Sequence, residues 1–473
     1  MSELRIISRH AGTVLVGQLA VMAFGVADTM IAGRYSDEAL AALSVGSAIY
    51  ISVYVGLIGV VQALLPIWAE LRGAGKYEAV GRSLRQSLYL SIAIVVVGMT
   101  ALLFPTPLLR WAQVPEPMEA EVLRYLEVLA FAFAPALLFR VYSSFNQSLG
   151  KPLLVTWLQI GALAVKIPLS IWLVAGGAGV EPMGAAGCAW ATLVVNYLLL
   201  LLAFIMLRTQ SLYEPYRLWS AVEAPDWSQI GRFLRLGVPA GLSYLVEVTS
   251  FTLMAVFIAR LGTTASASHQ IAASVATVLY MVPLSMAIAS SARVSFWLGA
   301  GQAQRAQKVV ALSLKLTGAC AFLLALCLFL GRGILPGWYS DTPEVQATAS
   351  ALLAWVAFYH LADAAQAVSA FLLRCYRITF MPLVLYSVGL WGLGLFGGYQ
   401  LTYEGLAGYE SMQTATGFWA ASTLAIALVA GSFLLLLWRT VRTKSPVGQV
   451  ARPESRAVFH PPHPRRGKND RKS

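Results

Sequence analysis

Charged residues are scarce in this chain. They make up 12% of its 473 residues, whereas 58% of the residues are hydrophobic. Soluble domains carry about 25% charged residues. The deficit excludes an ordinary soluble domain and indicates a protein that crosses a membrane many times.

Cysteine and catalytic motifs are also sparse. The four cysteines, Cys188, Cys320, Cys327 and Cys375, lie in or beside apolar stretches, so neither a disulfide framework nor a metal-binding spacing follows. The sequence has no Walker lysine motif, no dinucleotide-binding glycine motif and no HExxH. We therefore expect a protein that is not an enzyme and holds no cofactor. Any uphill transport must then draw on an ion gradient.

The net charge of +12 is concentrated in the C-terminal tail. From Arg439 onward the chain has ten Lys or Arg residues and only two acidic residues, Glu454 and Asp470. We interpret residues 441–473 as a disordered, basic, cytoplasmic tail that touches anionic lipid at most. A nucleic-acid partner is not expected.

Twelve stretches are long enough to cross a lipid bilayer, which takes about 20 mostly apolar residues. They predict an all-α membrane protein with twelve transmembrane helices. The stretches are 10–34, 41–69, 84–106, 121–145, 153–176, 184–208, 229–260, 267–293, 306–331, 345–372, 379–402 and 414–440.

Landmarks of the first half recur in the second half in the same order. Gly73-Ala74-Gly75 recurs as Gly299-Ala300-Gly301, and Pro152 recurs as Pro382 at nearly the same separation. A duplicated unit of six spans predicts two six-helix bundles related by a pseudo-twofold axis along the membrane normal. The expected domains are an N-terminal bundle (1–208), a cytoplasmic linker (209–228), a C-terminal bundle (229–440) and the tail.

Positive charge is unevenly distributed among the short loops. One set of loops holds positive residues that include Arg72, Lys76, Lys151, Arg305, Lys308 and Arg374, and the opposite set is poorer in Lys and Arg. Positive loops stay in the cytoplasm. We therefore expect both termini to be cytoplasmic in a multi-pass protein of the inner (plasma) membrane.

Two acidic residues lie inside apolar stretches of the second half, Glu247 and Asp363. A carboxylate in the bilayer costs several kcal/mol unless it has a partner or faces water. Together with an oxygen of Tyr280, the pair would suit Na⁺ or a proton. The alternative is that each acid only pairs with an arginine at a helix end.

A second pair of charges lies in the first half. Asp28 and Lys166 carry opposite charges deep in their spans, and we expect an ion pair, either structural or a gate. His360 is three residues before Asp363 and so shares its helix face, although a lone histidine is more often packing. Met281 and aromatic side chains would adapt to varied organic cations.

Several motifs resemble the multidrug and toxic compound extrusion (MATE) transporters, over the chain up to about residue 440. The matching pieces are Val26–Gly33 with its Asp-Thr pair, the Gly-Ala-Gly ends of spans two and eight, His269–Ile271, Gly187–Ala189 and Leu373-Arg374. The family implies export of cationic drugs against inward Na⁺ or H⁺.

The resemblance is strongest to the NorM-like bacterial branch. In that branch Glu247, Asp363 and Tyr280 match the cation-coupling site, and Asp28 matches the acid that handles substrate or protons. Lys166 departs from the pattern, because the branch typically has Asn there. An amine would hold Asp28 ionised, so we place coupling in the C-terminal bundle and favour Na⁺ over H⁺.

Two other functions stay open at this point. A lipid-linked oligosaccharide flippase of the same wider superfamily would need a cationic cavity, yet Lys166 stands almost alone among three acids. A passive channel or structural membrane protein is the third hypothesis. The expected partners are small cationic substrates and the bilayer, and the expected state is a monomer.

Overall fold

The computed structural model describes residues 2–106, 109, 116–177, 179–405 and 410–443. The regular secondary structure of this part of the chain is helical, apart from one isolated bridge between Gly177 and Val180. It contains twelve helical segments long and apolar enough to cross a membrane, which confirms the predicted all-α fold and number of spans.

The helices of the first half are α1 (Glu3–Tyr35), α2 (Asp37–Gln62), α3 (Leu65–Gly73), α4 (Tyr77–Leu103), α6 (Glu116–Ser148), α7 (Leu153–Ala175) and α8 (Ala185–Thr209). Those of the second half are α9 (Trp227–Ala259), α10 (Thr263–Gly299), α11 (Ala303–Gly331), α12 (Pro343–Cys375), α13 (Phe380–Ser387), α14 (Gly397–Tyr399) and α15 (Thr416–Thr443). Short 3₁₀ turns form η1 (Ser211–Tyr216) and η2 (Leu335–Trp338), and π-helices form η3 (Val388–Phe396) and η4 (Gln400–Glu404).

Two spans are composite. Helices α2 and α3 together form the second span, and α13 to η4 form the eleventh. The first span begins earlier than predicted, because the hydroxyl of Ser2 caps α1 by accepting a hydrogen bond from the backbone N–H of Arg5. The predicted tail also begins too early, since 441–443 continue α15; residues 444–473 lie outside the described part.

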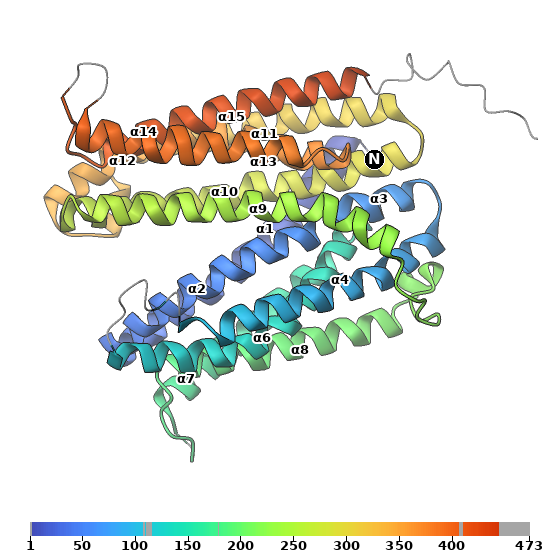
Figure 1. The fold of residues 1–473 in the computed structure, drawn as a ribbon, viewed down its shortest axis with the longest axis horizontal. Coiled ribbons are helices and arrows are strands. Elements are labelled where there is room, and N and C mark those ends of the chain that lie inside the picture. The colour runs from blue at the N-terminus through green and yellow to red at the C-terminus, as the bar shows by residue number, and fades with distance from the viewer. Residues whose placement is uncertain (1, 107–108, 110–115, 178, 406–409, 444–473) are drawn as a thin grey trace, which may run out of the picture.

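The buried side chains form two large hydrophobic cores. One core contains mainly first-half residues and the other mainly second-half residues. The exceptions are informative: Ile7, Ala11 and Val14 of α1 and Leu65 of α3 pack in the second-half core, and Phe233 of α9 packs in the first-half core. In Figure 1 the two layers of helices come closest where α3 and the N-terminus lie, and diverge toward the other end.

The two Gly-Ala-Gly sequences meet at this junction. A Cβ added to Gly73 would lie 1.9 Å from the carbonyl oxygen of Phe296, and a Cβ added to Gly299 would lie 1.8 Å from that of Glu70. Each glycine thus packs on the residue three positions before the other. Such reciprocal contacts are those of a two-fold axis. We call the end that carries Glu3, Gly73 and Gly299 the closed end.

Ionic contacts also join the halves at the closed end. Arg293 of α10 donates two hydrogen bonds to Glu3, at 2.6 and 2.7 Å, and Trp297 donates a third at 3.1 Å. Arg377 pairs with Glu70 across the same junction. The first residues of α1 are therefore held by the second half.

Gly299→Ala is expected to destabilise the closed end. The new methyl group would overlap the Glu70 carbonyl, which is backbone and cannot rotate away. Overpacking of this kind costs about 1–3 kcal/mol. Thermal unfolding of the purified protein measures the loss. Gly231→Ala is the matched control, because a Cβ there meets nothing within 4 Å; an equal effect of both changes would contradict the packing argument.

The segment between the halves is fastened to α4. Arg85 donates from Nε and Nη2 to Glu223, at 2.9 and 2.5 Å, and from Nη1 to the carbonyl of Arg217 at 2.7 Å. Tyr89 donates to the Glu223 carbonyl at 2.9 Å. The linker therefore packs on the first half, although α8 and α9 end and begin close to its predicted limits.

Glu223→Gln is expected to loosen this linker. The Arg85 hydrogen bonds lower the pKa of Glu223 from 4.5 to about 2. The carboxylate therefore contributes stability above pH 4.5, and this is lost as the pH falls through about 2. Because one third of the side chain is exposed, we expect a cost of about 1 kcal/mol or less. Thermal unfolding at several pH values measures it. A wild-type pH profile in the variant would contradict the assignment.

Candidate functional site

Glu247 opens onto a small cavity in the second half. The cavity has a volume of about 30 Å³, and its polar lining includes Tyr280, Gln366, Arg374 and Tyr386. Helices α9, α10, α12 and α13 all contribute, so the site exists only when the second half is assembled. A volume of this size holds one or two waters or a small ion. Glu247 itself is half-buried.

Asp363 lies deeper, on α12. Its residue is 4% exposed, and its Oδ1 has no hydrogen-bond partner within the described residues. It is close enough to Glu247 for the two to interact electrostatically. Among the ion pairs of the described chain, none involves either carboxylate. The structure therefore places the two predicted acids close enough to interact electrostatically. Neither carboxylate forms an ion pair with a described residue.

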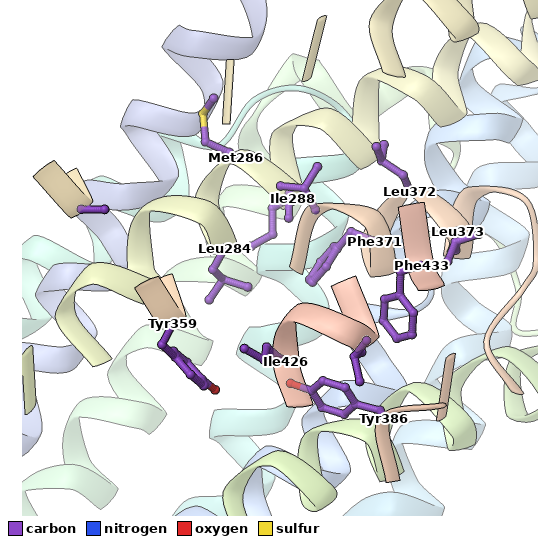
Figure 2. Close-up of a cluster of buried hydrophobic side chains, with 14 of the residues drawn as sticks. Leu284, Met286, Ile288, Tyr359, Phe371, Leu372, Leu373, Tyr386, Ile426 and Phe433 are labelled. Atoms are coloured by element: carbon purple, nitrogen blue, oxygen red, sulfur yellow. The ribbon is translucent and has the colours of Figure 1, made fainter. Parts of the chain in front are cut away.

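Three tyrosines surround these acids. Tyr280, predicted from the sequence, is joined by Tyr359 and Tyr386, and all three interact electrostatically with Glu247 and Asp363. In Figure 2 the hydroxyl ends of Tyr359 and Tyr386 point toward each other beside Ile426. Tyr359 precedes Asp363 by four residues, a spacing that would have placed it on the same helix face. Tyr386 gave no such signal, because it comes from another helix.

Arg374 corrects one sequence interpretation. We counted it as a loop charge, but the residue is only 6% exposed and lines the Glu247 cavity. Its guanidinium lies 4.3 Å from the ring centroid of Phe371 and 5.2 Å from that of Tyr244. The expected alternative, a direct pair between an acid and a helix-end arginine, is not formed by Glu247 in the described structure. The positive charge of Arg374 instead acts on Glu247 electrostatically, without a direct ion pair.

The two remaining candidates of the second half, His360 and Met281, lie outside the Glu247 cavity. His360 is 2% exposed, its Nε2 has no hydrogen-bond partner among the described residues, and no bond joins it to Asp363 there. Met281 is half-buried and packs against the second-half core. Neither side chain lines the Glu247 cavity.

The first half carries the ion pair that the sequence predicted. Lys166 Nζ lies 2.9 Å from Asp28 Oδ2 and donates to the hydroxyl of Thr192 at 2.8 Å. Ser170 donates to Asp28 Oδ1 at 3.2 Å. The Asp28 residue is 7% exposed and Lys166 only 1%. Both carboxylate oxygens are thus occupied, in contrast to Asp363.

One buried charge of the first half was not among the predicted site residues. Arg140 lies inside α6, its Nε is buried without a hydrogen-bond partner in the described structure, and its charge acts on Tyr54. It falls within the predicted span 121–145, so its position alone could have revealed it. The first half therefore holds one more cation than the Asp28–Lys166 pair suggested.

The MatE family model matches this chain over residues 14–172 and again over 239–400. The chain is 38% identical over 428 residues to "Probable multidrug resistance protein NorM" of Aromatoleum aromaticum, covering 90% of this chain and 92% of that protein. It is 35% identical to the protein of the same name from Chromobacterium violaceum, covering 92% and 93% of the two chains. It is 30% identical to "Multidrug resistance protein PmpM" of Pseudomonas aeruginosa, covering 93% and 92%.

Solved structures share the fold. The eukaryotic MATE transporter AtDTX14 superposes with a TM-score of 0.83 at 18% identity, over 93% of this chain and 98% of that one. The Vibrio cholerae MATE transporter VcmN, in its bent form, gives 0.80 at 18% identity over 93% and 98%. The resemblance stated from the motifs is thereby confirmed. With a family match in each half and relatives aligned over nine-tenths of its length, the chain belongs to the MatE family, whose members are membrane transporters and not enzymes.

Proposed function

We propose that this protein is a secondary antiporter that exports organic cations across the plasma membrane, driven by inward Na⁺ or H⁺. The observation that carries the proposal is the contrast between the halves. Asp28 is neutralised by Lys166, whereas Glu247 and Asp363 have no ion-pair partner in the described chain. Buried carboxylates of this kind attract a cation or a proton. The names of the relatives, multidrug resistance proteins, support drugs as substrates.

In the proposed coupling step, a cation enters the cavity at Glu247 and neutralises it together with Asp363. Tyrosine hydroxyls, the Gln366 amide and carboxylates are hard oxygen ligands, which suit Na⁺. Arg374 would repel a second cation and so favour single occupancy. Oxygen ligands supplied by several helices favour Na⁺, while protonation of the same acids is the alternative.

The cation is proposed to act by changing the stability of one conformation relative to the other. A ligand shifts such an equilibrium only by its difference in affinity for the two states. Cation binding draws together α9, α10, α12 and α13, while the Gly-Ala-Gly junction holds the closed end shut. The closed end is proposed to be cytoplasmic, with both termini there, because its loops carry the excess of Lys and Arg.

The substrate is proposed to be released through the opposite end, where the halves diverge (Figure 1). His360 and Met281 are proposed to modulate this step from outside the cation cavity.

The two halves already provide the reciprocal contacts that subunits of a dimer would otherwise provide, so we propose a monomer. Disruption of transport without a change of oligomeric state would be consistent with this arrangement.

Cation-dye efflux from reconstituted vesicles tests the proposal. An imposed Na⁺ gradient and an imposed pH gradient are applied one at a time. Efflux driven by Na⁺ alone supports a sodium site at the two carboxylates, and efflux driven by pH alone makes them a proton relay. Dye movement that only equalises the two sides would indicate a passive channel. Failure of both gradients to drive efflux would overturn the proposed antiport.

A further inference from the structure

A cavity of about 430 Å³ lies at the closed end, between the two halves. Its walls come from the start of α1, the end of α3, the turn between α6 and α7, and α10. The described residues that line it include no acid. Its cationic lining consists of Arg5, Arg9, Arg72, Lys151 and Arg293, and the side chain of His10 also lines it.

Most of this positive charge is not compensated. Arg293 is paired with Glu3, but Arg72 forms no ion pair among the described residues, and its Nε is buried without a hydrogen-bond partner. His10 is 8% exposed, and its Nε2 is likewise buried without a partner. Buried polar groups that lack a partner carry a desolvation cost. Like charges around a shared cavity also repel one another. Both costs would be relieved by an anion.

The arginines are held in place before any anion binds. The guanidinium carbon of Arg72 lies 4.8 Å from the ring centroid of Phe296, and that of Arg293 lies 5.1 Å from the same centroid. The backbone at Gly150 also lies beside the Arg72 guanidinium, since a Cβ built there would be 3.4 Å from Nη1, an ordinary van der Waals contact. One ring of the second half therefore orders one arginine from each half. Planar guanidinium groups ordered in this way match the oxygens of a phosphate.

We propose that this cavity binds a phosphate group, carried either by free phosphate or by the headgroup of an anionic phospholipid. The bound anion bridges Arg72 and Lys151 of the first half to Arg293 of the second half. It stabilises the conformation in which the closed end is shut and is released when the halves separate there. This anion site is separate from the cation cavity, because the two share no lining residue.

Thermal unfolding of the full chain in nanodiscs tests the proposal. Inorganic phosphate is titrated in discs of phosphatidylcholine, with chloride at equal ionic strength as the reference. In a second arm, phosphatidylglycerol replaces part of the phosphatidylcholine. We expect stabilisation in at least one arm. The double variant Arg9→Gln/Lys151→Gln removes two exposed cations and should bind about tenfold more weakly. Exposed positions are chosen because their replacement leaves the fold intact.

Arg232→Gln/Lys308→Gln is the matched control. It removes two exposed cations that do not line the cavity, so it should keep the wild-type response. Stabilisation by phosphatidylglycerol alone assigns the site to a lipid headgroup, and stabilisation by phosphate alone assigns it to a soluble anion. Absence of a shift in both arms, or equal weakening in both double variants, overturns the proposal. Thermal unfolding does not depend on efflux, so this experiment tests the anion site independently of the proposed antiport.

Discussion

Glu247→Gln is expected to reduce gradient-driven efflux to the level of vesicles without protein. Glutamine keeps the size of the side chain and its oxygen, but it cannot hold the negative charge that a Na⁺ ion or a proton must neutralise. Asp363→Asn should have the same effect, because Asp363 is buried with an unpartnered oxygen beside Glu247. Dye efflux under the imposed gradient measures both variants. Size-exclusion profiles and thermal unfolding show whether they remain folded.

The matched control for these variants is Glu344→Gln. Glu344 lies on α12, as Asp363 does, but it is exposed at the first turn of the helix and lines no described site. It should transport at the wild-type rate. Wild-type efflux in Glu247→Gln or in Asp363→Asn would refute the coupling site. Loss of efflux in the control as well would indicate a general sensitivity to removal of acidic charge.

Lys166→Asn is expected to destabilise the protein by about 3–5 kcal/mol, because it leaves the buried Asp28 carboxylate without its cation. The double variant Asp28→Asn/Lys166→Asn removes both charges and should recover most of the stability. Thermal unfolding of the two single variants and the double variant gives the coupling energy between the residues. A single variant as stable as the wild type would show that the pair contributes no stability.

The same variants separate the two roles that remain open for the pair. If the stable double variant transports at the wild-type rate, the pair is structural. If it is stable but inactive, the pair acts as a gate during transport. Lys308→Asn is the control for the loss of a lysine, since Lys308 is exposed near the start of α11. It should change neither stability nor efflux.

The number of spans followed from the sequence alone, whereas their exact limits did not. Bilayer thickness fixes the length of a spanning helix, so apolar runs identify it without reference to the rest of the fold. The repeated Gly-Ala-Gly motif also predicted the two-fold relation between the halves, which the reciprocal packing of Gly73 and Gly299 displays. The Asp28–Lys166 pair was predicted from the free energy of burying charge. Two opposite charges deep in one half are less unfavourable when they form an ion pair than when each is buried alone.

Only the tertiary structure decided which side chains share a site. The sequence singled out Glu247, Asp363 and Tyr280, but not Tyr386, which another helix brings to the same acids. It also placed Arg374 in a loop, whereas the fold buries it at the Glu247 cavity. The cationic cavity of the closed end joins α1, α3 and α10, which are far apart in the chain. Hydropathy and spacing describe one helix at a time, while the contacts between helices depend on how all twelve spans pack.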